Sequence, residues 1–449
     1  MDLTKEIQKR SDELLDELIA FCRIPSISSN KEGIDDAVKF IDTAAKQRGI
    51  VPEHLESPAN PMVYFHHQGS GKSPKTLLYY CHYDVVPVGD RSLWSSEPFG
   101  GAVIDGKVYC RGVSDHKGSM LARLQAIGIV QELLGELPVS VKMIAEGEEE
   151  LGSPYLEQVV EQNLDKIEAD ACFYSGWYRN EFDQVRVNGG SRGSVSVELS
   201  CEVAEKDLHG AFATLVPDPA IRLAAAVGTI VDSHMTCKLP GFYDSLSSIT
   251  PSDRAALNRI PFEWETFKRE LGIHKTVDLE DKMQILERHV FYPTVGIAEF
   301  AKSGKRGVVP AWARVDMSFR LAPGMDPRAL VPTIEQHLAA NGISGVKVRA
   351  SGRMGMPSRI PVDHWLLKAV VQSGRRVFGY DPVVYPVSSG SGPRYIFNHK
   401  GIPTIANIGP GYAGSNDHAP NENVRVADYL KCVEHETDIL MHGLSSEDS

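Results

Sequence analysis

Two neighbouring stretches, GSMLARLQAIGIVQELL (118–134) and VSVKMIA (139–145), carry the strongest signal for the fold. The first places apolar residues near one side of a helix, and the second is a short apolar run typical of a buried strand. A third run, TLLYYC (76–81), precedes both and also predicts a strand. Strand, helix and strand in this order indicate an α/β sheet with crossover helices.

The middle of the chain has a different pattern. Residues 189–203, GGSRGSVSVELSCEV, and residues 313–323, ARVDMSFRLAP, alternate between polar and apolar side chains. Such alternation predicts half-exposed strands. We therefore expect a second domain, residues 189–352, inserted into a first domain made of residues 1–188 and 353–449.

Composition excludes several classes of protein. The chain has 449 residues, of which 42% are hydrophobic and 24% charged, as in an ordinary soluble protein of two or three domains. The net charge of −12 includes no Lys/Arg tract, so we expect no nucleic-acid partner. No apolar run is long enough to predict a membrane span. Seven cysteines without metal-binding spacing predict reduced thiols in a cytoplasmic protein.

Four glutamates, Glu146, Glu148, Glu149 and Glu150, follow the predicted strand 139–145 almost directly. Their mutual repulsion needs compensation, either by solvent or by a bound cation. Because a Gly-Ser turn follows them at the end of a buried strand, we favour the cation.

Other polar residues also follow predicted strands. His82 and Asp84 come directly after TLLYYC, and residues two apart in an extended stretch point the same way. Asp115 lies in a glycine-flanked loop before the helix, where alternation predicts that His116 points elsewhere. His418 lies in the loop AGSNDHAPNENV. Ligands collect at the carboxyl ends of strands in α/β sheets, so these side chains predict a shared site.

The residue types favour a divalent metal ion. Imidazole and carboxylate groups are suitable ligands for Zn²⁺ and related ions, and one carboxylate can bridge two ions. The metal charge can hold one glutamate as a ligand and leave its neighbour free to act as a base. These residue types therefore allow a two-metal hydrolytic site.

Four motifs resemble those of the M20 metallopeptidase family, which includes aminoacylases, deacetylases and carnosine-type dipeptidases. They are HYD (82–84), RGVSDHKG (111–118), EGEEELGS (146–153) and SNDHAPNE (415–422). The resemblance runs from about residue 15 to residue 440. It implies a catalytic α/β domain whose central mixed sheet is flanked by helices, interrupted by an α+β lid and dimerisation domain.

The resemblance implies one or two divalent ions per chain, zinc or else manganese or cobalt. His82 would bind one ion, Glu150 and His418 would bind the other, and Asp115 would bridge the two. Asp84 would orient His82, as metal-bound imidazoles usually require.

The resemblance also implies catalytic and substrate-binding roles. Glu149 would be the general base, and His209 in KDLHGAF would stabilise the oxyanion in the site of a neighbouring subunit. Arg320 would bind the carboxylate of the substrate, together with Ser391 and Gly392 in SSGSGP. These roles imply a homodimer that acts on a small peptide or amide.

One position departs from the family pattern. The family has an Asp or Glu about 25 residues beyond the EExGS motif, where this chain has Ser175 or Gly176. Glu181 and Asp183 lie downstream and are alternative donors. The departure leaves three alternatives open: a weakened two-metal site, a one-metal enzyme or an inactive relative.

The leading hypothesis is a cytoplasmic enzyme that hydrolyses the amide bond of a dipeptide or similar substrate with a free carboxylate. A deacylase or amidase acting on N-acyl amino acids is the second hypothesis. A catalytically silent dimer that binds ligands or regulates a partner is the third.

Overall fold

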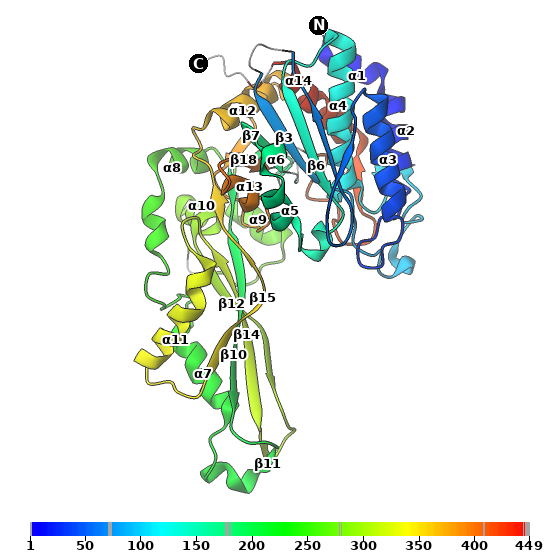
Figure 1. The fold of residues 1–449 in the computed structure, drawn as a ribbon. Coiled ribbons are helices and arrows are strands. Elements are labelled where there is room, and N and C mark those ends of the chain that lie inside the picture. Colours follow the sequence, from blue (N-terminus) through cyan, green and yellow to red (C-terminus); the bar gives the residue numbers. More distant parts are fainter. Residues whose placement is uncertain are drawn as a thin grey trace.

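Two β-sheets organise the molecule in the computed structural model (Figure 1). The structure describes residues 2–70, 74–174, 176, 179–180, 182–277, 279, 281–406, 409–442 and 444. The larger sheet has eight strands, in the order β1 (Glu53–Leu55), β2 (Met62–His67), β6 (Ser140–Glu146), β3 (Thr76–His82), β7 (Ala171–Tyr174), β18 (Thr404–Ala406), β8 (Arg186–Asn188) and β17 (Val383–Tyr385).

The larger sheet is mixed, as expected. Strands β6, β3, β7 and β18 are parallel to one another, whereas β1 and β2 add to the sheet in the antiparallel sense. The parallel strands end at one edge of the sheet, which places the residues that follow them close together.

Helices cover both faces of this sheet. One face packs against α1 (Leu3–Lys9), α2 (Ser11–Cys22), α3 (Ile34–Gln47), α4 (Gly118–Leu134), α12 (Trp365–Phe378) and α14 (Val426–Met441). The other face packs against α5 (Leu156–Gln162), α6 (Leu164–Ile167) and α13 (Tyr395–Asn398). The predicted strand–helix–strand unit is thus β3, α4 and β6, and α4 is buried along most of its length because α14 covers it.

The second sheet has four antiparallel strands and projects away from the first (Figure 1). Its order is β12 (Thr294–Lys302), β14 (Trp312–Leu321), β10 (Gly193–Glu202) and β15 (Lys347–Gly355). Helices α7 (Pro219–Ile230) and α11 (Leu330–Ala340) cover one face. The alternating patterns at 189–203 and 313–323 correctly predicted β10 and β14, because each strand buries every second side chain against those helices.

Short strands complete the fold. Residues of β11 (Leu208–His209) and β13 (Val308–Val309) pair at the far end of the second sheet, and β9 (Gly190–Ser191) pairs with β16 (Ser358–Arg359). A three-stranded sheet joins β19 (Asn423–Arg425), β5 (Lys107–Tyr109) and β4 (Ala102–Ile104). This last sheet brings the segment around β19 beside the loop that carries Asp115.

The polar and aromatic segment 239–290 packs against the edge of the eight-stranded sheet. Helices α8 (Pro251–Asn258), α9 (Trp264–Glu270) and α10 (Lys282–Phe291) share an apolar cluster with Val383 and Tyr385 of β17. The segment therefore covers an edge strand whose backbone would otherwise be open to pairing.

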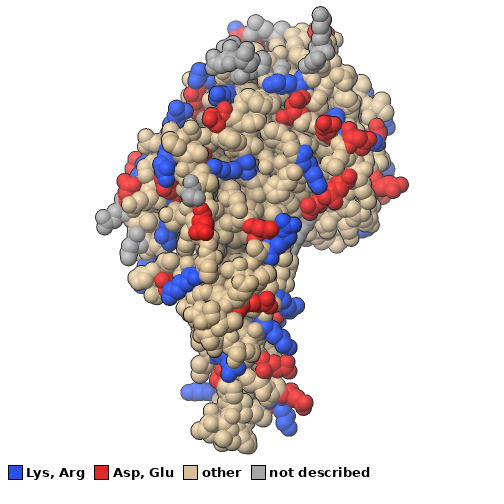
Figure 2. Space-filling view, turned by 60° about the vertical axis from the view of Figure 1, so that its left-hand side comes forward, with Lys and Arg blue, Asp and Glu red and all other residues tan. Residues whose placement is uncertain are grey.

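The surface carries both signs of charge. On the face drawn in Figure 2, lysine and arginine are interspersed with aspartate and glutamate, and no large basic area appears. All seven cysteines are buried and none forms a disulfide, as expected. Among the described residues, no helix has the length and apolar character needed to cross a membrane.

Candidate metal centre and active site

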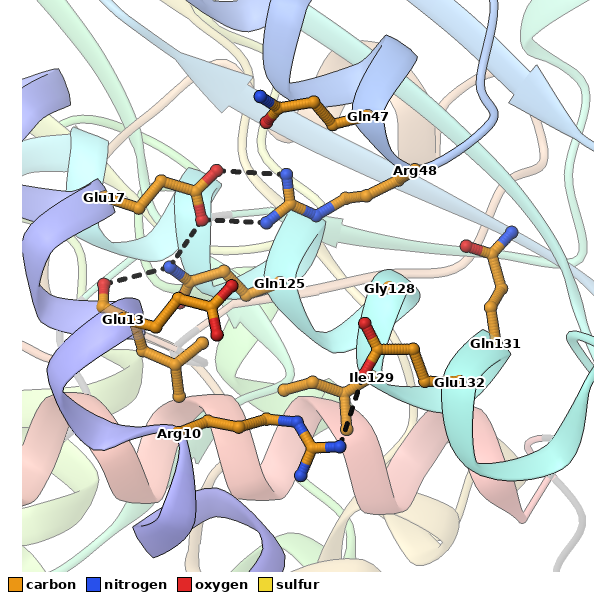
Figure 3. Close-up of a pocket in the computed structure, with 11 residues that line it drawn as sticks. Arg10, Glu13, Glu17, Gln47, Arg48, Gln125, Gly128, Ile129, Gln131 and Glu132 are labelled. Atoms are coloured by element: carbon orange, nitrogen blue, oxygen red, sulfur yellow. Dashed lines mark hydrogen bonds and ion pairs between the residues drawn. The ribbon is translucent and has the colours of Figure 1, made fainter.

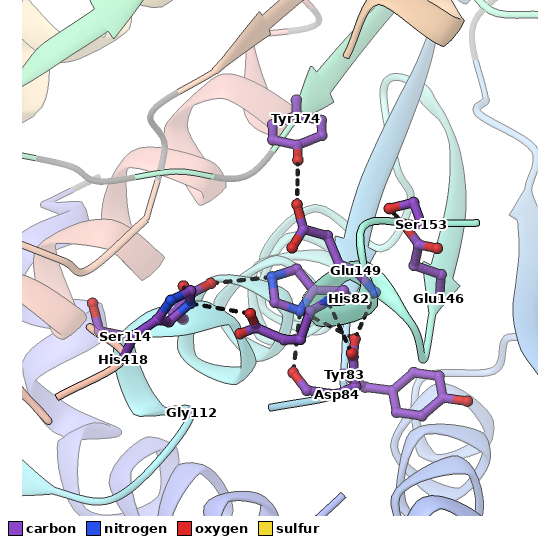
Figure 4. A network of polar contacts seen from close by, with 12 residues as sticks. His82, Tyr83, Asp84, Gly112, Ser114, Glu146, Glu149, Ser153, Tyr174 and His418 are labelled. Carbon is purple, nitrogen blue, oxygen red and sulfur yellow. Dashed lines mark hydrogen bonds and ion pairs between the residues drawn. The ribbon is translucent and has the colours of Figure 1, made fainter. Parts of the chain in front are cut away.

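The candidate site lies where the parallel strands of the large sheet end (Figure 4). His82 is the last residue of β3, and Glu146, opposite it in the register, is the last residue of β6. Tyr174 ends β7, the neighbour of β3 on the other side. The sequence correctly predicted that this edge gathers polar residues.

Asp84 connects two parts of the site. Its carboxylate is fully buried, and Oδ1 lies 3.4 Å from Nδ1 of His82. The backbone N–H groups of Glu149 and Glu150 donate to Oδ1 and Oδ2 of Asp84, each at 3.1 Å. Asp84 therefore contacts both the ring of His82 and the turn that carries both glutamates, and the sequence did not reveal the second contact.

His82, Asp115 and His116 form a first cluster of potential metal ligands. Nε2 of His82 lies 3.1 Å from Oδ1 of Asp115, and the rings of His82 and His116 stack with centroids 4.8 Å apart. The expectation that His116 points elsewhere was wrong. It assumed strand-like alternation, whereas Val113–Lys117 is a short helical segment whose backbone is non-helical at Asp115.

Asp115, Glu150 and His418 form a second cluster. Nε2 of His418 lies 3.0 Å from Oδ2 of Asp115 and 3.0 Å from Oε2 of Glu150. Asp115 thus directs one carboxylate oxygen to each cluster. The structure brings together the four residues predicted as metal ligands: His82, Asp115, Glu150 and His418.

These residues fit a divalent cation. Within each cluster the ligand atoms lie within 4.8 Å of one another. Ligands of a zinc ion lie about 2.0–2.2 Å from the metal, so these atoms need to move only slightly closer together to bind one ion. Oε1 of Glu150 and Nδ1 of His116 are buried without a hydrogen-bond partner. Hydrogen bonds with Asp115 and Glu150 raise the pKa of His418 to about 10, so a metal ion would displace a proton there.

Glu149 has the properties of a general base. Burial raises the pKa of its carboxyl to about 7, although the positive charge of His82 opposes the shift. The hydroxyl of Tyr174 donates to Oε1 of Glu149 at 3.1 Å. A carboxyl that titrates near neutral pH can accept a proton and release it again within one reaction cycle.

The other two glutamates of the motif belong to neither metal cluster of the described residues. Glu146 accepts hydrogen bonds from the hydroxyl of Tyr80 and, at 2.6 Å, from Oγ of Ser153. Burial raises the pKa of Glu146 to about 8, so it is mostly protonated at neutral pH. Glu148 is buried, and burial raises its pKa as well. The repulsion among the four glutamates is thus relieved by protonation and by the positive partners of Glu149 and Glu150.

Glu422 is a further residue of the site that the sequence analysis did not single out. Its buried carboxylate accepts from the backbone N–H groups of Gly112, Ser114 and Asp115 at 2.9–3.0 Å and from Nη1 of Arg111 at 2.7 Å. Glu422 therefore holds the turn that presents Asp115. The sequence offered one signal for this residue, because Glu422 is the acidic residue that ends the motif SNDHAPNE.

A pocket of about 360 Å³ opens beside the clusters and is lined by Glu149, Glu150 and His418. The same pocket is lined by the three residues predicted to bind substrate: Arg320, Ser391 and Gly392. Nη1 of Arg320 donates to Oγ of Ser391 at 2.9 Å. A guanidinium thus faces the same cavity as the carboxylates of the metal clusters.

A second, larger pocket of about 610 Å³ lies among α1, α2, α3 and α4 (Figure 3). It is lined by charged side chains that neutralise one another. Arg48 pairs with Glu17 at 2.8 Å, and Arg10 pairs with Glu132 at 3.2 Å. None of the predicted site residues lines it, so it offers no chemistry comparable to that of the first pocket.

His209 is not part of the site within this chain. It lies in β11, at the end of the second sheet that is remote from the large sheet (Figure 1). Its side chain is exposed, and Nδ1 accepts from the backbone N–H of Ala211 at 3.2 Å.

The missing carboxylate has no replacement among the candidates that the structure describes. Ser175 and Glu181 lie outside the described residues, and Gly176 has no side chain. Asp183 is directed to Arg425, with 2.7 Å between its Oδ1 and Nη1 of the arginine.

Comparison with known proteins identifies the family of the chain. A model of peptidase family M20/M25/M40 matches residues 78–442. The Beta-Ala-His dipeptidase of Rattus norvegicus is 26% identical over 429 residues, which cover 91% of this chain and 85% of the rat protein. The Cys-Gly metallodipeptidase dug1 of Schizosaccharomyces pombe is 26% identical over 96% of this chain and 95% of its own length.

A solved structure is also similar over nearly the whole chain. The M20 family metallo-carboxypeptidase Sso-CP2 from Sulfolobus solfataricus superposes with a TM-score of 0.87 at 34% identity, covering 96% of this chain and 99% of that one. The family model alone spans far more than half of the sequence. The chain therefore belongs to peptidase family M20/M25/M40, and it is an M20-type metallopeptidase.

Proposed function

We propose that this enzyme hydrolyses the peptide bond of a dipeptide or similar small substrate that has a free carboxylate. The observation that carries the proposal is one pocket lined by Glu149, the metal-ligand candidate Glu150 and the guanidinium of Arg320. The two curated relatives compared above are dipeptidases by name, which supports the substrate class.

The proposed chemistry needs a divalent metal, zinc or else manganese or cobalt, held as one or two ions by His82, Asp115, Glu150 and His418. The metal supplies Lewis acidity, which lowers the pKa of water and polarises an amide carbonyl. Glu149 takes the proton of the attacking water and delivers it to the leaving amine.

Other residues hold the reacting groups in place. Asp84 holds His82 and, through two backbone N–H groups, the turn that carries Glu149. The hydroxyl of Tyr174 fixes Oε1 of Glu149. A base positioned in this way needs little reorganisation when the proton moves, which favours the reaction.

Arg320 sets the substrate class in this proposal. Its guanidinium can bind a carboxylate through two hydrogen bonds, with Ser391 and Gly392 lining the same part of the pocket. A pocket of about 360 Å³ suits a small substrate rather than a folded protein.

We further propose a homodimer in which the partner's copy of His209 completes the site. His209 is exposed at the end of an extended sheet, a position from which it can reach a second molecule. A cytoplasmic location is also proposed, and the seven buried free thiols support it.

The test compares three substrate classes on the same metal-loaded enzyme: dipeptides, N-acyl amino acids, and dipeptides whose carboxylate is converted to an amide. We expect the highest kcat/KM for free dipeptides and a large loss for their amides. Higher kcat/KM for N-acyl amino acids would favour a deacylase, and equal rates with amidated dipeptides would contradict the role of Arg320.

A further inference from the structure

His116 is a buried histidine that the proposed reaction leaves without a role. Its side chain is only 6% exposed, and its Nδ1 has no hydrogen-bond partner. A buried polar nitrogen without a partner destabilises the fold, so its place beside the metal clusters calls for an explanation.

The surroundings of His116 are those of a metal ligand. Its ring lies against that of His82, with centroids 4.8 Å apart and planes 30° apart. A ring nitrogen of His116 and ligand atoms of His82 and Asp115 lie within 4.8 Å of one another. Among the described residues, the group of side chains that can hold an ion at His82 consists of His82, Asp115 and His116.

Without His116, the part of the chain that the structure describes offers two donors to the cluster at His82. His82 and Asp115 would leave an ion mostly to water, and Asp183 is occupied by Arg425. Metal sites that retain an ion usually have at least three ligands from the protein.

We propose that His116 is the third protein ligand of the ion held by His82 and Asp115. This inference rests on the metal requirement of the proposed function, but it concerns the ligand set and not the substrate. With His116 as a ligand, the site at His82 and the site at Glu150 differ in the chemistry of their ligands. One has two imidazoles and a shared carboxylate, whereas the other has one imidazole and two carboxylates, one of them shared.

The difference in ligands predicts a difference in metal preference. Imidazole suits zinc, nickel and copper, whereas carboxylates also suit manganese. We expect the His82 site to keep Zn²⁺ and to exchange Mn²⁺ readily, and the Glu150 site to accept both ions.

The experiment counts metal ions per chain. The metal-free full-length protein is loaded with Zn²⁺, dialysed, and measured by elemental analysis as wild type, His116→Ala and His116→Asp. We expect two ions in wild type, one in His116→Ala, and two again in His116→Asp, because a carboxylate restores a ligand. His435→Ala, which removes another fully buried histidine, is the matched control and should keep both ions.

A second measurement separates lost coordination from lost folding. X-ray absorption of the Zn²⁺-loaded protein should report three imidazoles shared by two ions in wild type, and His116→Ala should retain the ion at Glu150. An unchanged ion count in His116→Ala, or a single ion in wild type, would overturn the proposal. His116→Ala could lose both ions. In that case the proposal would be overturned if His116→Asp also failed to bind an ion at His82.

This outcome is independent of the substrate. An enzyme that binds two ions with His116 as a ligand but fails on dipeptides would refute the proposed function alone. Conversely, dipeptide turnover by wild type together with an unchanged ion count in His116→Ala would refute only the ligand assignment.

Discussion

The two sheets of the molecule use charged residues in opposite ways. At the edge of the eight-stranded sheet, Asp84 and Glu146 are fully buried, and each carboxyl group accepts hydrogen bonds from neighbouring groups of the protein. In the four-stranded sheet, β14 buries one face against helices and leaves Arg320 on the other, in the pocket. In the proposed function, the first region performs the chemistry, and the second contributes a residue, Arg320, that selects the substrate.

This difference has a physical basis. Buried charges tolerate little change because each one depends on its partners, whereas an exposed residue on an alternating strand can change without disturbing the buried face. We therefore expect substitutions in the large sheet to affect turnover and substitutions in the second sheet to affect substrate choice.

The sharpest test of the comparison is Glu149→Ala. It should lower kcat by about 10²- to 10⁴-fold, because it removes the proton acceptor. The metal content should stay that of wild type, since the ligand candidates remain. Glu148→Gln, next to it but outside the pocket, is the matched control and should keep most of the activity. Robust turnover by Glu149→Ala would refute the assigned base.

His209 tests whether the second sheet also serves chemistry. His209→Ala should lower kcat by about 10²- to 10³-fold, the usual cost of losing an oxyanion donor. His234→Ala, another exposed histidine of the same region, should have little effect.

The proposed action of His209 across a dimer has a separate test. Inactive His209→Ala and inactive Glu149→Ala subunits, when mixed, should regain part of the activity, because one site of the mixed dimer is complete. No recovery, despite subunit exchange measured with labelled chains, would show that His209 does not act in trans.

Arg320→Ala should change substrate choice, and its effect on the rate should be smaller than those of Glu149→Ala and His209→Ala. Loss of a charged hydrogen-bonding partner costs about 1.5–3 kcal/mol, which corresponds to about 10- to 150-fold in kcat/KM for dipeptides. Amidated dipeptides should be affected much less. Arg314→Ala on the same face of β14 is the control, since Arg314 pairs with Glu299 at 2.8 Å and lies outside the pocket.

Tyr174→Phe should have the smallest effect. The hydroxyl of Tyr174 donates to the ionised form of Glu149 and favours it, so its removal should raise the pKa of Glu149. The acidic limb of the kcat/KM profile should therefore move to higher pH, and the rate at pH 6 should fall several-fold. An unchanged profile would mean that the hydrogen bond does not act on the base.

The sequence predicted those features that depend on short stretches. Strand ends followed by His82, Asp115 or the glutamates are local patterns, and the alternation of β10 and β14 is visible in each strand alone. The position of His116 was missed because it depends on a turn whose backbone follows neither strand nor helix periodicity. Glu422 was missed because its partners are about three hundred residues away in the sequence.

The carboxylate of Glu422 has a consequence for the synthesis of the chain. It joins residues separated by 310 positions, because it accepts from the backbone N–H of Gly112. Contacts over such separations form late, after the entropy of closing a long loop has been overcome. A nascent chain that has not yet released β19 from the ribosome lacks the support for the turn at Asp115. The turn that presents Asp115 to both clusters is thus held by a contact that can form only after the segment around Glu422 has been synthesised.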